Sequence, residues 1–178
     1  MFRVILDANV VILLHELEIW EKVCSQCQIY LSEAVVAELK YYEAGGQQKP
    51  IDHEALRAAV TVCSVTVGEL KEFFDQFDPT YQQRLDPGEL ESLVYLFKQT
   101  DASEDLIICS ADAIVFRILG CINKSDRGIS LEELLQGIGL TKKLPEQYCR
   151  GFRIKWTKIG QEDALQDRGK RSPPGSGP

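Results

Sequence analysis

Short, nearly continuous apolar runs alternate along the chain with segments in which apolar residues recur at helical spacing. The apolar runs, and one stretch of alternating β-branched residues, predict strands over 2–6, 28–31, 60–67 and 105–109. The helical spacing predicts helices over 10–23, 33–42, 52–59, 69–77 and 111–119. Strands that alternate with helices are typical of a parallel sheet that is covered by helices on both faces. We therefore predict an α/β fold.

Two further helices are predicted by their start signals. Asp86-Pro-Gly-Glu89 places an aspartate at the N-cap, a proline at the first helical position and a glutamate where it completes a capping box. Ser130 and Glu133 form a second capping box, ahead of a helix over 131–136. The segment before the first of these helices, residues 79–88, is predicted to be a loop.

The apolar pattern weakens after Thr141. Residues 152–159 alternate like an edge strand, and residues 161–178 lose apolar periodicity and end in Ser-Pro-Pro-Gly-Ser-Gly-Pro. We therefore expect three parts: a main domain over 1–140, an extension with a possible edge strand over 141–160, and a disordered tail over 161–178.

Composition narrows the picture only in part. The 178 residues suit one domain. The formal net charge of −7 argues against a nucleic-acid partner, but a bound cation inverts the charge of an acidic pocket and weakens that objection. The six cysteines are irregularly spaced, and neither a signal peptide nor a membrane span is evident, so we expect a cytoplasmic protein with reduced thiols. Cys24-Ser-Gln-Cys27 lacks the second pair or nearby histidine that a zinc site needs.

Acidic residues follow two of the predicted strands. Asp7 comes directly after the first strand, and Asp112 comes three residues after the strand that ends at Cys109. In parallel sheets, ligands bind outside the carboxyl ends of the strands, so we expect both carboxylates at one edge of the sheet. Three further candidate acids lie in predicted helices: Glu38, Glu89 and Glu91.

Converging carboxylates suit the hydrolysis of a phosphodiester. Mg²⁺ or Mn²⁺ prefers oxygen ligands, lowers the pKa of a bound water and neutralises phosphate charge. Without a cation, carboxylates a few ångströms apart repel one another, and one of them stays protonated. A cluster of this kind therefore predicts a metal site.

Each of these acids also has a purely structural interpretation. Asp7 and Asp112 could cap the helices that follow them, Glu38 could face solvent, and Glu89 could serve only in the capping box. Glu91 lies about 200° around the helix from Glu89, so we expect only one of the two in a single site.

At this point the residues resemble the PIN domain family. Val4-Ile-Leu-Asp7-Ala-Asn9-Val-Val-Ile12 is similar to its first motif, and Leu31-Ser-Glu-Ala-Val-Val-Ala-Glu38-Leu39 is similar to its second, in which a helix carries a glutamate. Leu85-Asp-Pro-Gly-Glu89-Leu-Glu91 resembles a segment of one bacterial and archaeal branch, and Leu106-Ile-Ile-Cys-Ser-Ala-Asp112-Ala resembles the last motif. The resemblance covers roughly residues 1–140.

The resemblance implies a three-layer α/β/α sandwich with a central parallel sheet, and an endoribonuclease that depends on Mg²⁺ or Mn²⁺. Carried over by position, the catalytic metal ligands would be Asp7, Glu38, Glu89 and Asp112, with Glu91 as the alternative to Glu89. Asn9 and Ser110 would orient ligands or phosphate. Many members of this branch are toxins of toxin–antitoxin pairs, which implies a cognate antitoxin or another inhibitor protein, and a homodimer, as candidate partners.

Two alternatives stay open. A non-catalytic PIN-like module that binds RNA or a protein would share the fold without cleaving RNA. The extension contains six basic residues near Phe152 and Trp156, which could contact RNA: Lys142, Lys143, Arg150, Arg153, Lys155 and Lys158. The interpretation we favour is an ordinary edge strand with solvated lysines. A dinucleotide enzyme is disfavoured, because the turn after the first strand, Asp7-Ala-Asn9, lacks glycine.

Overall fold

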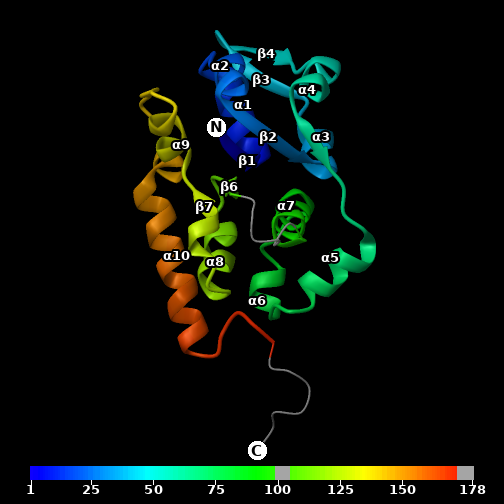
Figure 1. Cartoon of the computed structure of the whole chain (residues 1–178), viewed down its shortest axis with the longest axis vertical. Coiled ribbons are helices and arrows are strands. Elements are labelled where there is room, and N and C mark those ends of the chain that lie inside the picture. Colours follow the sequence, from blue (N-terminus) through cyan, green and yellow to red (C-terminus); the bar gives the residue numbers. More distant parts are fainter. Residues whose placement is uncertain (99–104, 172–178) are drawn as a thin grey trace, which may run out of the picture.

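The computed structural model describes residues 1–98 and 105–171, and its centre is a five-stranded parallel sheet (Figure 1). The strand order is β5-β2-β1-β6-β7, and all four pairings are parallel. The strands are β1 (Phe2–Leu6), β2 (Cys27–Ser32), β5 (Thr61–Cys63), β6 (Leu106–Cys109) and β7 (Gly128–Ile129). The predicted parallel α/β architecture is therefore confirmed, with β7 as an additional short edge strand.

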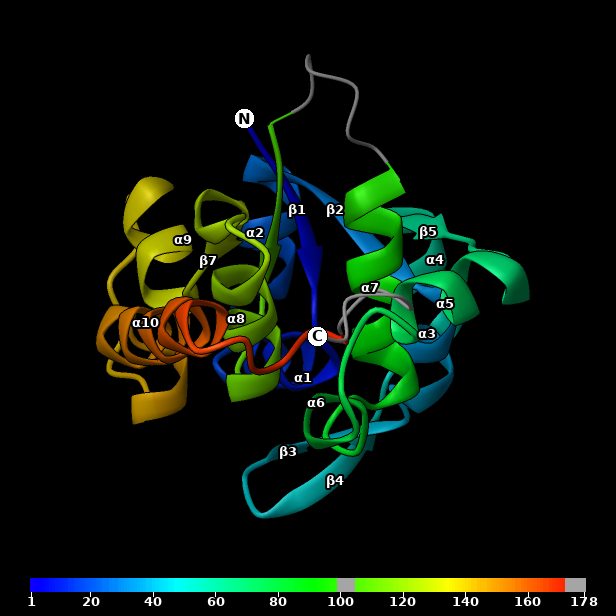
Figure 2. The same cartoon turned by 90° about the horizontal axis from the view of Figure 1, so that it is seen from below.

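Helices cover both faces of the sheet (Figure 2), as in a three-layer α/β/α sandwich. Successive side chains of a strand point to opposite faces, so Val4 and Leu6 join one apolar core and Ile5 joins the other. The first core packs against α1 (Ala8–Glu16), α2 (Trp20–Gln26), α3 (Glu33–Glu38), α4 (His53–Ala59) and α9 (Leu131–Gly137). The second packs against α5 (Val67–Phe74), α6 (Pro79–Gln82), α7 (Pro87–Lys98), α8 (Ala113–Cys121) and α10 (Arg150–Leu165).

Two predicted helices are shorter than expected. The helix predicted over 10–23 is two helices, α1 and α2, because Glu18 takes a left-handed backbone conformation with φ of 56°. The helix predicted over 33–42 ends at Glu38, and the chain then forms an antiparallel hairpin of β3 (Tyr41–Ala44) and β4 (Gln47–Pro50). Gly45 and Gly46 make its two-residue turn with φ of 62° and 75°, which glycine adopts without strain.

Helices begin within two segments that were predicted to be a strand and a loop. The strand predicted over 60–67 ends at Cys63, because Thr66 and Glu69 form a capping box that starts α5 at Val67. The loop predicted over 79–88 contains the short helix α6, with Asp78 as its N-cap and a proline at its first turn. In both cases local capping groups decide where the helix begins.

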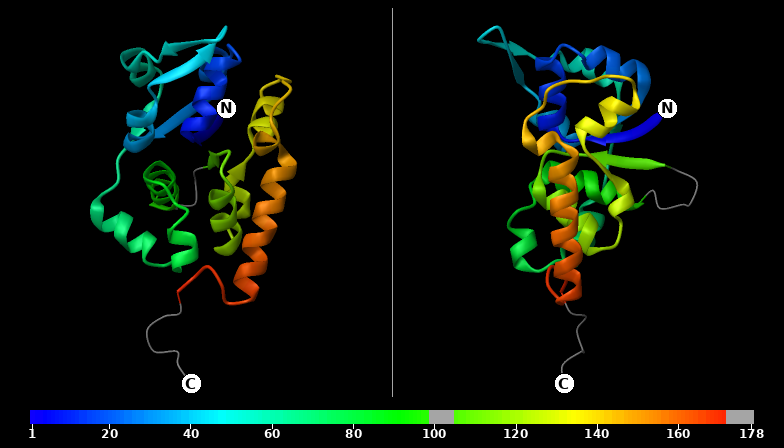
Figure 3. Two further views of the ribbon diagram at one scale, coloured as in Figure 1. Left: turned by 180° about the vertical axis from the view of Figure 1, so that it is seen from behind. Right: turned by 90° about the vertical axis from the view of Figure 1, so that its left-hand side faces the viewer.

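The edge strand predicted over 152–159 is wrong, because these residues lie inside the long helix α10 (Figure 3). Phe152 and Trp156 are four residues apart, so on a helix they share the face that packs on the second core. The helix continues to Leu165, and Lys170 pairs with Phe77 in an isolated bridge, so the predicted disordered tail is ordered as far as the structure describes it. Residues 172–178 of that tail lie outside the described residues.

All six cysteines are free thiols in this structure. In the described ranges, no helix combines the length and the apolar character needed to span a membrane.

Candidate functional site

Asp7 and Ser110 lie side by side at the carboxyl edge of the sheet. Leu6 and Cys109 are register partners in β1 and β6, so the residues that follow them leave the sheet together. Asp7 Oδ2 accepts a hydrogen bond from Ser110 Oγ at 2.9 Å and another from the Ala111 backbone N–H at 3.2 Å. Its Oδ1 accepts from Asn9 N–H at 3.0 Å and caps α1. Asp7 therefore both caps a helix and faces the site.

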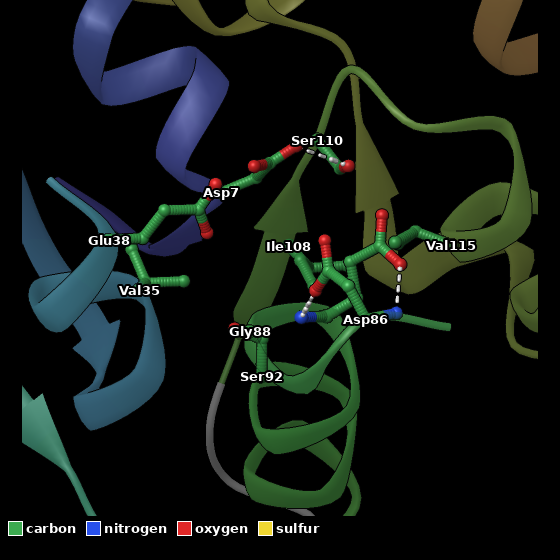
Figure 4. A pocket seen from close by; sticks show the side chains of 10 residues that line it. Asp7, Val35, Glu38, Asp86, Gly88, Ser92, Ile108, Ser110 and Val115 are labelled. Carbon is green, nitrogen blue, oxygen red and sulfur yellow. Dashed lines mark hydrogen bonds between the residues drawn. The ribbon is translucent and has the colours of Figure 1, made fainter. Parts of the chain in front are cut away.

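Three more acidic residues surround the same small pocket (Figure 4). Glu38 is the last residue of α3, Asp86 precedes α7, and Glu89 lies in the first turn of α7. With Asp7, they bring four carboxyl groups from three separate segments to one space, since Asp86 and Glu89 both belong to the start of α7. Its enclosed volume of about 10 Å³ is about what one water molecule requires and is far below the roughly 300 Å³ of common organic-ligand pockets, so the pocket suits a small ion or water.

The sequence alone assigned Asp86 to helix capping and missed it as a residue of this pocket. The capping box is present: Glu89 N–H donates to Asp86 Oδ1 at 2.8 Å, and Asp86 N–H donates to Glu89 Oε2 at 3.1 Å. Both carboxyl groups still line the pocket, so the capping interpretation and the site interpretation hold together. Asp86 was missed because only the packing of α7 against α3 shows which way this helix start faces.

Burial and mutual repulsion raise the pKa values of three of these groups. Burial, followed by the charges of Asp112, Asp86 and Asp7, raises the pKa of Glu89 to about 9, and its side chain is only 7% exposed. Burial also raises the pKa of Asp7, against the hydrogen bonds from Asn9, Ala111 and Ser110. The pKa of Glu38 is raised by burial and then by Asp86 and Asp7. A cation in the pocket would relieve this repulsion.

Ser92 provides a second indication that a polar group binds here. It lies one turn after Glu89 in α7 and lines the pocket, and its buried Oγ has no hydrogen-bond partner among the described residues. Buried polar atoms are nearly always paired with protein or ordered water. The hydroxyl is therefore available to a water molecule or to a hydrated ion.

The remaining candidate residues lie around the pocket rather than in its lining. Asp112 Oδ1 caps α8 through the Ile114 N–H, although the carboxylate is near enough to raise the pKa of Glu89. Glu91 Oε2 accepts from Ala34 N–H at the start of α3, so the structure favours Glu89 over Glu91. The Asn9 side chain is exposed.

The donor set fits a hard divalent cation in its chemistry, because it consists of carboxylate and hydroxyl oxygens. Its side-chain positions are not those of a formed chelate: no group of three or more His, Cys, Asp or Glu residues within 1–98 and 105–171 is placed to hold an ion together. Comparisons with protein-family models, with curated proteins and with solved structures gave no match. The likeness to the PIN family therefore rests on the four sequence motifs.

Proposed function

We propose that this protein is an endoribonuclease that depends on Mg²⁺ or Mn²⁺ and cleaves RNA at the pocket of Asp7, Glu38, Asp86 and Glu89. The observation that carries the proposal is the gathering of these four carboxyl groups, from three separate segments, at the carboxyl edge of a parallel sheet. Ligands of such sheets bind at this edge. Asp112, next to Glu89, would be a further acid of the same cluster.

A divalent cation bound there would supply a nucleophilic water and charge neutralisation at the phosphate. Hydrogen bonds within the chain orient three of the donor groups. Ser110 Oγ and the Ala111 N–H orient Asp7, and the reciprocal capping bonds orient Asp86 and Glu89. Side chains oriented in this way on a sheet edge and a helix start have less freedom to lose when a cation and substrate bind.

A non-catalytic PIN-like module that binds RNA or protein is the competing proposal, and one observation favours it. In the part of the chain that is described, the acids do not form a ready chelate, and Asp112 already has a capping role. The two proposals differ in whether RNA is cut when a divalent cation is present.

The test is cleavage of a labelled single-stranded RNA with Mg²⁺ or Mn²⁺, by the wild type and by Asp7→Asn. We expect Asp7→Asn to lower the cleavage rate by about a hundredfold or more, because the amide carries no charge. The amide oxygen can still accept from Ser110 and Ala111, whereas the amide nitrogen cannot accept the Asn9 N–H, so the variant should lose only the helix cap, worth about 1 kcal/mol of stability. Asp52→Asn is the matched control: Asp52 caps α4 just as Asp7 caps α1, but it lies outside the acidic pocket.

Equal cleavage by wild type and Asp7→Asn would show that the nuclease activity does not arise here. A wild type that binds RNA but leaves it intact with either cation would favour the non-catalytic module.

A further inference from the structure

One segment of this acidic protein is locally basic. Residues 141–160 contain six lysines and arginines and one acid, a formal charge of +5, whereas the whole chain has a net charge of −7. The rest of the chain therefore carries −12. A local excess of this size in an acidic protein is the electrostatic pattern of a surface that meets a polyanion.

The structure exposes five of these six side chains. Lys142 and Lys143 are exposed in the segment between α9 and α10. Arg150, Lys155 and Lys158 are exposed on α10, at angles that place them on one solvent-facing side of the helix. We call Lys142, Lys143, Arg150, Lys155 and Lys158 the basic face. Arg153 does not belong to it, because its guanidinium pairs with Glu133 through two hydrogen bonds of 2.7 Å.

Neighbouring acids only partly neutralise the basic face. Arg150 lies 3.4 Å from Glu133, and Lys158 lies 3.8 Å from Glu162. Pairs this exposed are weak and exchange readily with other anions. Lys155 lies over the ring of Trp156, which holds its position but leaves its charge.

The middle of the basic face, between Lys143 and Lys155, is tied to the edge of the sheet that bears the acidic pocket. Tyr148 OH donates to the backbone oxygen of Asn9, two residues after Asp7, at 3.3 Å. The Arg150 N–H donates to Glu132 Oε2 at 2.8 Å, in the first turn of α9, which begins at the carboxyl end of β7. Figure 3 shows α10 running away from this region along α8. An RNA strand bound along α10 can therefore continue toward Asp7.

We propose that the basic face binds the phosphate backbone of RNA and leads the strand to the acidic pocket. This rests on the proposed function for the cleavage step, but not for the binding step. Lysines act as point charges without base preference, so the contact is with phosphates and is independent of sequence. Such a surface is needed because the acidic pocket and the rest of the chain repel RNA. An anionic membrane fits less well, because helices that bind a membrane surface expose a broad apolar face, whereas the large apolar side chains exposed on α10 are Ile154 and Leu165.

The test measures binding of a labelled 20-nucleotide oligo(U) in EDTA, where no divalent ion supports cleavage. The variant is Lys142→Glu/Lys143→Glu, and the matched control is Lys22→Glu/Lys124→Glu. Lys22 precedes β2 and Lys124 precedes β7, so the control makes the same charge change near the amino ends of the strands. We expect the variant to raise the Kd about tenfold or more and to lower the slope of log K against log salt by about 0.7 per lost contact. The control should stay close to wild type.

A second pair, Lys155→Glu/Lys158→Glu, tests the helical part of the face in the same assay, with circular dichroism to verify folding. Unchanged affinity and salt slope in both variants would overturn the basic face, even if wild type cleaves RNA. Wild type that binds RNA through the basic face but never cleaves it would refute the proposed nuclease and leave the basic face standing. If the variants lose binding to vesicles that contain phosphatidylserine while their RNA binding stays at the wild-type level, the basic face contacts a lipid surface and the proposed RNA contact is refuted.

Discussion

Glu89 combines two roles that conflict at neutral pH. Its carboxyl group accepts the Asp86 N–H in the capping box, and it is buried beside other acids, which raises its pKa to about 9. The helix start favours a charged group at this position, whereas burial and the neighbouring carboxylates favour the neutral acid. Without a cation, the neutral form prevails, and deprotonation costs folding free energy.

The pH dependence of stability tests this conflict. Because the folded-state pKa of Glu89 lies above its ordinary value of 4.5, its contribution to stability is fully present below pH 4.5 and is lost as the pH rises through about 9. Glu89→Gln keeps the capping acceptor and cannot ionise. In EDTA, we expect the variant to gain on the order of 1–3 kcal/mol over wild type between pH 5 and pH 8. Urea unfolding of wild type and Glu89→Gln at both pH values measures this difference in the free energy of unfolding. If the stability of the two proteins changes with pH in the same way, Glu89 is not a buried, neutral carboxyl group.

At the scale of elements, the tightest packing is between α8 and α10. A Cβ added to Gly120 would lie 2.1 Å from the Thr157 backbone oxygen, and one added to Gly160 would lie 1.9 Å from the Arg117 backbone oxygen. The two helices therefore touch backbone to backbone, which glycine alone allows. This contact holds α10, and with it the basic face, against the domain.

We expect Gly160→Ala to destabilise the protein by about 2–4 kcal/mol, because a backbone must move to admit the methyl group. Gly151→Ala is the control on the same helix: nothing lies within 4 Å of an added Cβ, so higher helix propensity should raise stability by up to about 1 kcal/mol. Thermal unfolding of both variants checks this. If the two substitutions changed the melting temperature equally, α8 and α10 would not cross this closely.

At the scale of the whole molecule, the C-terminal part of the chain is attached to α6 and α8 through Asp163. This carboxylate is 1% exposed and accepts from Tyr81 OH at 2.8 Å, from Arg117 Nε at 2.6 Å and from Arg168 at 3.0 Å. Burial raises its pKa, but the hydrogen bonds from Arg117 and Tyr81 outweigh burial and lower it overall. The charged form is therefore the stabilising one.

We expect Asp163→Ala to cost about 3–5 kcal/mol, because it leaves the partly buried Arg117 without its partner. Arg168→Gln should cost well under 1 kcal/mol, since the Arg168 side chain is 60% exposed and its pair is screened by solvent. Because the folded-state pKa is lowered, this stability is present above pH 3.8 and is lost as the pH falls below it. Chemical unfolding at pH 6 and pH 3 measures both effects, and a pH-independent difference between wild type and Asp163→Ala would argue against an ionised Asp163.

Local pattern alone determined the central strands, most helix starts and the place of Asp7 at the carboxyl edge of the sheet. The reason is that strand burial and capping depend on residues only a few positions apart. The capping boxes at Asp86 and Ser130 were predicted for the same reason, and both are present.

Tertiary structure decided what the local pattern left ambiguous. Phe152, Ile154 and Trp156 alternate as in a strand, yet Phe152 and Trp156 also suit a helix, and packing on α8 selects the helix. Packing also decided which acids share the pocket. Because α7 packs against α3 in one particular rotation, Asp86 lines the pocket and Glu91 caps α3. Periodicity shows that a residue faces inward or outward, but only the packing of distant segments shows which other residues it meets.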